Sequence, residues 1–448
     1  MNINNAALFY KLAHDFNFTD FTKRVLNFIE RFFVLVCENK NFLELDLDSF
    51  RKIISSSEIN IDCEIEIFNA IDSWVKYDFQ ERSDYLIYFL SKVRLSLLSD
   101  HAINAILSSS FSYRKIDGFT AILEDELQNR RNLDKNISII DSNRYCNQNN
   151  FDILISCGTN DRLNRHFMGY PNKALFNIQQ IDGRNFNTVK ELAPMEHGRK
   201  NAKSVYCRGA VYLFGGLDED DHAVIPVEKY SLLTNSWETV ANMIDYRTYG
   251  FCSCAFMDQV YIIGHFIYSS LKFDTKNNKW KVIPKMNEER TGQACTVYGG
   301  RIVVCGGWNV ENPDGLNSVV AYDPFSHSWT SMPRMIERRR FNHKLIAMRN
   351  KLFVVGNFFA NETILKCEVF DSASNRFVSL KECPSLFTFD LNLVANAFLI
   401  ENKVIIVGHE SSTALCYNVA KNKIFEETCD VTKEIWSFSS TLVPLIKL

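Results

Sequence analysis

The sequence predicts a multidomain fold: an all-α domain at the front, followed by an all-β domain that closes six repeated units into a ring. Three observations carry this prediction. Residues 1–114 hold apolar side chains at the three- and four-residue spacing of helices, with few glycines or prolines. From residue 151 onward, apolar strands end at glycine and are followed by two aromatic side chains seven residues apart. The 448 residues are enough for both domains.

The front domain, residues 1–114, contains two clear apolar stripes at helical spacing. The first consists of Phe21, Val25, Phe28, Phe32 and Val36, and the second of Ile67, Ile71, Trp74 and Val75. Asp62 is expected to cap the second helix, with Glu64 and Glu66 in its first turn, where carboxylates complement the helix dipole. From these stripes alone, the domain is an ordinary helical bundle. Residues 115–150 then become polar and charged, which predicts one last helix followed by a linker.

Six copies of one signature fill residues 151–448. The two clearest copies are Gly215-Gly216 with Tyr230 and Trp237, and Gly306-Gly307 with Tyr322 and Trp329. The eroded copies are Gly264 with Phe273 and Trp280, Gly356 with Phe370 and Phe377, Gly408 with Tyr417 and Ile424, and a weak first copy at Gly158 with Phe186. The second aromatic recurs at spacings of 43, 49 and 48 residues from Trp237 to Phe377, which is the period of a four-strand unit.

Each residue of the signature has a structural role. Glycine at the end of the second strand lets the chain turn and lets bulky side chains approach its backbone. The aromatic side chains of the third and fourth strands are expected to fill the core between neighbouring units, rather than to form a ligand site. Residues 436–446 are similar to a lone first strand, whereas residues 151–158 begin at a second strand. The last strand is therefore expected to complete the first unit and close the ring.

The front domain also shows an ordered set of landmarks. They are Asn5-Ala-Ala-Leu8, Phe28-Ile29, Phe42-Leu-Glu-Leu45, Glu64, Trp74-Val75, Arg82 and Val93-Arg-Leu95. This order resembles the BACK domain, the helical module between a BTB domain and kelch repeats in the kelch-like family. The glycine and aromatic signatures are similar to kelch motifs, each supplying one blade of a β-propeller. Because the sequence opens at the start of the BACK region, we expect a kelch-like protein that lacks the N-terminal BTB domain.

The resemblance implies that partner binding lies on the loops at one rim of the propeller. One loop set follows the glycines, at residues 217–226, 265–270, 308–315, 358–363 and 410–413. The other leads into each blade and carries an arginine at matching places, namely Arg199, Arg247, Arg290 and Arg340. The predicted rim residues are Arg199, Arg247, Arg290, Trp308, Arg338, Arg339 and Arg340. The Arg338–Arg340 cluster suits carboxylates or a phosphopeptide, and Trp308 is a candidate aromatic anchor. The acidic loop Asp218–Asp221 is a candidate to reach across the same rim. The alternative is that a recurring arginine caps strands or pairs with an acidic neighbour.

Charge and motifs narrow the function further. Lysine and arginine (50) nearly balance aspartate and glutamate (53), which predicts no nucleic-acid or membrane partner. Thirteen cysteines without a Cys-x-x-Cys pair predict buried, reduced thiols and no metal site, and Cys252-Ser-Cys254 is interpreted as packing. No catalytic or phosphate-binding motif is present, so neither an enzyme nor a cofactor is predicted. Without a signal peptide, a cytoplasmic protein is expected, with the cytoskeleton or nucleus as other compartments.

Three functions remain open. In relatives, the BTB domain and the start of BACK dock on cullin-3, so the resemblance implies a substrate-recognition adaptor of a cullin-3 ubiquitin ligase, with the propeller holding a protein substrate. The second function is an actin-binding or cytoskeletal scaffold. The third is a decoy that binds the target without recruiting the ligase.

Overall fold

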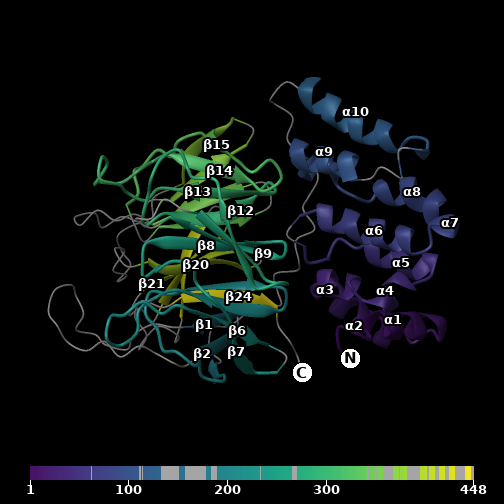
Figure 1. The fold of residues 1–448 in the computed structure, drawn as a ribbon, viewed down its shortest axis with the longest axis horizontal. Helices are drawn as coiled ribbons and strands as arrows, with labels where there is room; N and C mark the ends of the chain where they lie inside the picture. The colour runs from purple at the N-terminus through teal and green to yellow at the C-terminus, as the bar shows by residue number, and fades with distance from the viewer. Residues whose placement is uncertain are drawn as a thin grey trace. The chain divides into compact units, whose positions relative to one another are not determined.

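The computed structural model describes most of the chain. It covers 1–109 without 62, then 113, 115–132, 151–156, 178–182, 189–356 without 233, 265–269, 341–342 and 349–350, 367–380 without 373, and the strands within 394–400, 403–408, 413–418, 423–428 and 439–444. The chain divides into two compact units, a helical one within Met1–Asn147 and a strand-rich one within Gln148–Leu448. Figure 1 shows the elements of both units.

The helical unit is a succession of short helices. They are α1 (Ala6–Asp15), α2 (Thr19–Arg31), α3 (Phe33–Cys37), α4 (Lys40–Leu43), α5 (Leu47–Ile54), α6 (Ile65–Tyr77), α7 (Phe79–Arg82), α8 (Leu86–Leu90), α9 (Asp100–Ser109) and α10 (Phe119–Asn132), with 3-10 turns at Ser83–Tyr85 and Leu95–Leu97. The predicted second stripe is confirmed, because all four of its residues are buried on α6. Asp62, the predicted cap, lies outside the described residues.

The predicted first stripe is divided between two helices. Phe32 separates α2 from α3, so Val25 and Val36 are buried from different helices. Phe21 is 36% exposed, and its ring is tilted against that of Phe9, with ring centroids 6.3 Å apart. The sequence spacing therefore identified an apolar face but missed the helix boundary within it.

Trp74 is the centre of the helical core. Its ring stacks on Phe50 with centroids 4.3 Å apart, and Phe89 meets it edge-on at 5.6 Å. Because a buried indole N–H needs an acceptor, the Trp74 Nε1 donates to the Leu45 carbonyl at 2.9 Å. The guanidinium of Arg82 lies 4.1 Å from the Trp74 ring centroid, which joins α7 to this core.

The strand unit consists, in the part of the chain described, of six four-stranded antiparallel sheets. Their strands are β1 (Phe151–Ser156), β2 (Ile178–Asp182), β3 (Val189–Glu191); β4 (Lys203–Cys207), β5 (Ala210–Phe214), β6 (Pro226–Ser231), β7 (Ser236–Asn242); β8 (Phe251–Phe256), β9 (Gln259–Gly264), β10 (Ser270–Asp274), β11 (Lys279–Ile283); β12 (Ala294–Tyr298), β13 (Arg301–Cys305), β14 (Val319–Asp323), β15 (Ser328–Met332); β16 (Lys344–Met348), β17 (Lys351–Val355), β18 (Cys367–Asp371), β19 (Arg376–Ser379); β20 (Val394–Ile400), β21 (Lys403–Gly408), β22 (Thr413–Asn418), β23 (Lys423–Thr428); and β24 (Ser439–Pro444). The predicted class of helices followed by kelch-type sheets is confirmed.

The seven-residue aromatic spacing has a simple origin in strand register. The two aromatic residues of a copy lie directly opposite each other on the third and fourth strands of a sheet, as Tyr230 does with Trp237 and Tyr322 with Trp329. Their ring centroids are 5.1 Å apart in both pairs. Each is thus a cross-strand aromatic pair, the arrangement that stabilises neighbouring strands.

In three sheets the fourth-strand tryptophan also donates a hydrogen bond to the end of the fourth strand of the preceding sheet, or to a residue shortly after it. The indole N–H groups of Trp237, Trp280 and Trp329 each donate at 2.8 Å, to the backbone carbonyls of Ala193, Asn242 and Pro284 in turn. The predicted inter-unit role of these tryptophans therefore includes a specific hydrogen bond as well as packing.

Two glycines show why this residue recurs at the end of the second strand. Gly215 has φ +62°, and a Cβ there would lie 2.3 Å from the Arg247 carbonyl oxygen of the next sheet. Gly306 has φ +62° too, and its Cβ would lie 2.5 Å from the His343 ring nitrogen. Both the backbone angle and the close approach exclude a side chain. The equivalent glycines are Gly216, Gly264, Gly307 and Gly356, all with positive φ, and Gly408, which ends β21.

The inner strands contact one another in the order β24, β4, β8, β12, β16 and β20, and β20 contacts β24 again. β24 pairs along its whole length with β1, from Ser439 opposite Ser156 to Pro444 opposite Phe151. In Figure 1 the yellow strand β24 lies beside the teal strand β1. These contacts support the ring, whereas the count of six blades stays a prediction, as do the domain bounds.

Candidate partner-binding rim

Both predicted loop sets lie at one edge of each sheet. The second strand of a sheet ends where the first begins, so the loop after the glycines pairs with the segment entering the sheet. Isolated backbone bridges show this pairing between Lys200 and Leu217, and between Thr291 and Trp308. This edge is called the rim below.

The recurring arginines do not point to solvent at the rim. Arg199 is 0% exposed, and its Nη1 donates to the carbonyls of Gly215 at 3.2 Å and Pro226 at 3.1 Å. Its Nη2 forms an ion pair with the Glu228 carboxylate, which is equally buried. Arg199 therefore binds the carbonyl of the glycine that ends the second strand of its own sheet. We call this arrangement the glycine clamp.

Two further sheets repeat the clamp. Arg247 donates to the Gly264 carbonyl and pairs with Asp245, whose Oδ2 lies 2.9 Å from Nη2. Arg290 donates to the Gly306 carbonyl at 3.1 Å and pairs with Glu288 at 2.8 Å. In both, the carboxylate comes from two residues before the arginine instead of from the third strand. Burial lowers the pKa of Arg290, and the Glu288 charge opposes that shift.

The fourth clamp corrects the sequence alignment. Arg339, not Arg340, donates to the Gly356 carbonyl and pairs with Glu368 at 2.7 Å. Adjacent arginines made the spacing to the glycine ambiguous, and the structure turns Arg339 inward. The expectation that Arg199, Arg247, Arg290 and Arg339 line an accessible surface is therefore corrected, since all four are at most 3% exposed. They match the alternative in which a recurring arginine caps strands and pairs with an acidic neighbour.

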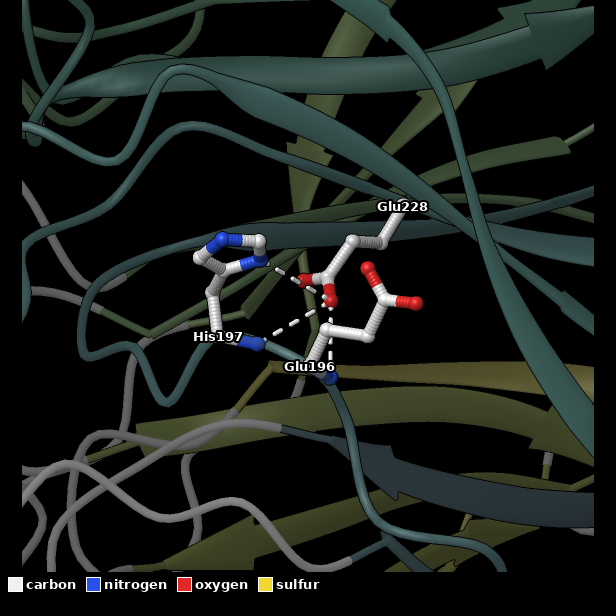
Figure 2. Close-up of side chains that lie close together, drawn as sticks. All are labelled: Glu196, His197 and Glu228. Atoms are coloured by element: carbon white, nitrogen blue, oxygen red, sulfur yellow. Dashed lines mark hydrogen bonds and ion pairs between the residues drawn. The ribbon is translucent and has the colours of Figure 1, made fainter.

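Glu228 also orders the turn that precedes Arg199, as Figure 2 shows. One of its oxygens accepts from the backbone N–H groups of Glu196 at 2.9 Å and His197 at 3.1 Å. Ligand atoms of Glu196, His197 and Glu228 lie within 4.8 Å of one another, a spacing that metal sites share. However, N–H donors and the Arg199 guanidinium already occupy the Glu228 oxygens, so the cluster is the anchor of a turn. Glu368 repeats this role with the N–H groups of Ile336 at 2.7 Å and Glu337 at 3.1 Å.

Trp308 and Arg340 are brought together at the rim. The Trp308 backbone is fixed by hydrogen bonds to Thr291 of 2.9 and 3.0 Å. The Arg340 guanidinium lies 5.0 Å from the Trp308 ring centroid, a cation–π contact that holds both side chains partly exposed. Arg338 is exposed beside them in sequence. The structure thus keeps three of the predicted rim residues accessible.

Two exposed tyrosines that the sequence analysis missed lie in the segment entering the neighbouring sheet. Tyr246 is 66% exposed and Tyr249 is 51% exposed, both in the segment entering β8. Next to Tyr249, the Gly250 carbonyl accepts from the Gly292 N–H at 2.7 Å, which connects this segment to the one that pairs with Trp308. The sequence did contain a signal for Tyr246. It directly precedes the clamp residue Arg247, just as the predicted rim residue Arg338 directly precedes the clamp residue Arg339. The name aromatic–basic patch is used below for Tyr246, Tyr249, Trp308, Arg338 and Arg340.

The acidic loop forms its own local contacts. Asp221 pairs with Lys200 at 2.5 Å, within the same sheet. Asp218 accepts from the backbone N–H groups of Asp220 at 2.9 Å and His222 at 2.8 Å. Three other predicted rim loops, at 265–270, 358–363 and 410–413, fall largely outside the described residues.

The helical unit carries a separate exposed apolar surface at α1 and α2. Leu8 and Leu12 are each 42% exposed on α1, and Phe16 and Phe18 follow it at 67% and 60%. The two phenylalanine rings stack with centroids 6.1 Å apart. Large apolar side chains gathered on a surface are typical of a protein contact. We call Leu8, Leu12, Phe16, Phe18 and Phe21 the α1–α2 apolar surface.

The cysteines of β8 and β12 meet between neighbouring inner strands. Contact with the thiols of Cys252 and Cys254, together with burial, raises the pKa of the Cys295 thiol well above its ordinary value. A thiol in this state holds little of the reactive thiolate. The geometry agrees with the interpretation of Cys252-Ser-Cys254 as packing. Among the helices that the structure describes, none has the length and apolar character needed to cross a membrane.

Comparison with known families matches both parts of the chain. The family model "BTB And C-terminal Kelch" matches residues 6–108, and the model "Kelch motif" matches residues 198–244 and 289–336. The kelch matches span β4–β7 and β12–β15, the two sheets with the clearest sequence signature.

Curated relatives match much of this chain at low identity. Kelch-like protein 25 of Xenopus tropicalis is 22% identical over 92% of this chain and 68% of its own length. Kelch-like protein 28 of Mus musculus is 25% identical over 67% of this chain and 44% of its own length. Kelch-like protein 6 of Homo sapiens is 23% identical over 80% of this chain and 49% of its own length. The chain thus spans between about half and two thirds of these relatives. The solved structure of YjhT aligns with a TM-score of 0.44 and 15% identity, over 56% of this chain and 91% of that one.

Proposed function

We propose that this chain, which joins a BACK domain to kelch motifs and is related to kelch-like proteins, acts as a protein-interaction adaptor. In this proposal, the kelch rim holds a target protein and the BACK domain contacts a second protein. The finer part of the proposal is that the second protein is cullin-3 and that the chain selects substrates for its ubiquitin ligase. No residue is assigned a catalytic role.

The observation that carries the proposal is the aromatic–basic patch. The clamp arginines use their donors inside the sheets, whereas Trp308, Arg338 and Arg340 stay accessible on the same loops. Exposed aromatic and arginine side chains on a rigid scaffold are the residues that dominate protein interfaces. Two arginines beside aromatic rings favour a target segment that carries carboxylates or a phosphate.

A second observation supports an adaptor with two contacts. The α1–α2 apolar surface lies on the other unit of the chain and consists of leucine and phenylalanine side chains. A basic neighbour is Arg24, whose guanidinium lies 5.9 Å from the Phe21 ring centroid. Residues 1–36, which contain it, correspond by resemblance to the segment that assists cullin-3 docking in relatives. An apolar surface there and a basic aromatic one on the rim fit two different partners.

The target contact is tested by quantitative affinity capture from cells with the full chain. A variant with Trp308→Ala and Arg340→Glu should lose a defined subset of captured proteins at least about tenfold, as the loss of an interface hot spot predicts. Val282→Ala removes a 58% exposed apolar side chain from β11 and serves as the matched control. Equal capture by the double variant and the control would refute the rim.

The cullin contact is tested separately with a purified N-terminal fragment of cullin-3. The wild-type chain should bind it, Leu12→Asp with Phe18→Asp should abolish binding, and Tyr88→Ala, a 41% exposed control on α8, should leave it unchanged. If the wild-type chain captures targets but does not bind cullin-3, the ligase part fails and the decoy function is favoured. Co-sedimentation with actin filaments separates the scaffold function from both.

A further inference from the structure

The inner strands of the ring carry an unbalanced positive charge. Across the six strands, Lys203 on β4 and Lys344 on β16 are the only charged residues, and neither aspartate nor glutamate occurs on any of them. This composition differs from that of the outer strands, where charges of both signs occur, as in β3 and β23, which each carry lysine and glutamate.

The two lysines occupy the same register position in two sheets that lie on opposite sides of the ring. Lys203 pairs with Phe214, the residue before Gly215, and Lys344 pairs with Val355, the residue before Gly356. In the contact order of the inner strands, β4 and β16 are three steps apart in either direction. Equivalent positions in two sheets thus place the two lysines at the same end of the inner strands, close enough for the charge of Lys203 to act on Lys344.

Both ammonium groups lack a counter-charge in the described part of the chain. Each lysine is only partly exposed, and no carboxylate of the described residues lies within ion-pair distance of either. Burial and, secondly, the positive charge of Lys203 together lower the pKa of Lys344 to about 7. Two like charges that are held together and partly desolvated favour the binding of an anion.

The neighbouring strands offer no alternative partner. The ionisable groups on the described strands packed against β16 are Cys295 and Tyr298 on β12 and Lys351 on β17, and none of these is an anion at neutral pH. His343, which precedes Lys344, is buried and donates from Nε2 to the Cys305 carbonyl, and burial lowers its pKa to about 3. It therefore stays neutral and adds no charge of either sign.

We propose that Lys203 and Lys344 form a binding site for a small inorganic oxyanion of the phosphate and sulfate class. Two lysines present six N–H donors and two positive charges, which match a doubly charged oxyanion. The bound anion would join β4 to β16 across the ring and remove the repulsion between the two ammonium groups. This site is separate from the aromatic–basic patch and does not depend on the proposed adaptor function.

Thermal unfolding of the full chain tests the site. Low millimolar sulfate should raise the Tm saturably, by on the order of ~5 °C when the anion is far above its Kd, compared with chloride at equal ionic strength. Lys203→Met and Lys344→Met should each abolish this rise, whereas Lys351→Met, an exposed lysine on β17, should keep it. The sulfate effect should also weaken as the pH rises from 6 to 9, because Lys344 loses its charge while sulfate does not. Equal responses of all four proteins, or equal effects of sulfate and chloride, would overturn the proposal.

A second measurement uses the wild-type protein, so it stands even if a variant fails to fold. Acetylation of lysines by limiting acetic anhydride is followed by mass spectrometry with and without inorganic phosphate. Phosphate should slow the modification of Lys203 and Lys344 several-fold and leave Lys351 unchanged. Uniform rates at the three lysines in both conditions would contradict the site.

Discussion

Arg339 and Glu368 form an ion pair of 2.7 Å in which both side chains are at most 1% exposed. The pair recurs as Arg199 with Glu228 on another sheet. In each glycine clamp of the described sheets, one buried guanidinium joins the glycine carbonyl to a carboxylate. The clamp therefore buries the guanidinium charge at the edge of the sheet and neutralises it with the carboxylate. The neighbouring loop residues remain exposed to solvent.

Removing the Glu368 carboxylate should destabilise the strand unit strongly. Glu368→Gln keeps the side-chain volume but leaves the Arg339 charge buried, which costs about 3–5 kcal/mol. Glu238→Gln is the matched control, because Glu238 pairs with Lys229 at 2.8 Å on a surface where it is 59% exposed, and such pairs contribute about 0–1 kcal/mol. Urea unfolding of both variants measures the difference. Similar losses in the two variants would show that the clamp charge is solvated after all.

Acid should destabilise the strand unit through His343. Its pKa is about 3 in the folded protein against an ordinary value of 6.5. The unfolded chain therefore binds the extra proton between these values, and the free energy of unfolding falls by about 1.4 kcal/mol per pH unit as the pH drops through that window. Below the folded pKa, this contribution stops changing.

The variant His343→Gln isolates that contribution. Gln293 occupies the equivalent place in the preceding sheet and donates to the Ile263 carbonyl at 2.6 Å, as His343 Nε2 meets the Cys305 carbonyl at 3.0 Å. The variant should match the wild type near pH 8 and be the more stable protein near pH 4. His222→Gln changes an exposed histidine and should leave the pH profile as it is. Parallel profiles for wild type and His343→Gln would refute the assignment.

A methyl group at Gly306 should be far more costly than one at Gly299. Both have positive φ, at +62° and +57°, so alanine pays about 1 kcal/mol of backbone strain at either position. A Cβ at Gly306 would also lie 2.5 Å from the His343 ring, whereas no atom lies within 4 Å of one at Gly299. Overpacking adds about 1–3 kcal/mol. Thermal unfolding of the two alanine variants should separate them by several degrees, and equal Tm values would contradict the close approach.

Deleting the chain after residue 438 should destabilise the whole strand unit. The deletion removes β24, which pairs with β1 along its length and contacts β4 and β20. The exposed edge of β1 and the broken circuit of inner strands should lower the Tm and speed proteolysis of the strand unit. A control truncation after residue 445 keeps β24 and should behave like the wild type. An unchanged Tm for the longer deletion would refute ring closure by β24.

The repeat pattern could be predicted because it depends on local geometry. Glycine with positive φ and an aromatic pair facing across a hairpin leave the same trace in every copy, as at Gly306 and at Tyr322 with Trp329. The boundary at Phe32 could not be predicted, because a continuous apolar stripe is compatible with one long helix or two short ones. Helix ends depend on tertiary contacts that the spacing does not encode.

The site residues could be predicted only in part. Recurrence identified the arginines. However, a side chain that recurs from repeat to repeat often has the same structural role each time, and the buried Arg199 and Arg290 both bind the carbonyl of a strand-end glycine. The accessible residues, such as Tyr249 and Trp308, break the repeat. Departure from the pattern was therefore the better indicator of an accessible rim residue than the pattern itself.

The pairing of β24 with β1 also sets the order in which the protein becomes native during synthesis. β1, β2 and β3 leave the ribosome first in the strand unit, yet their sheet lacks its inner strand until β24 has been made. The intervening sheets can form one after another while this first sheet waits with an open edge. The strand unit therefore completes its fold only after translation has passed β24, and the nascent chain must keep β1 from pairing with other strands throughout that interval.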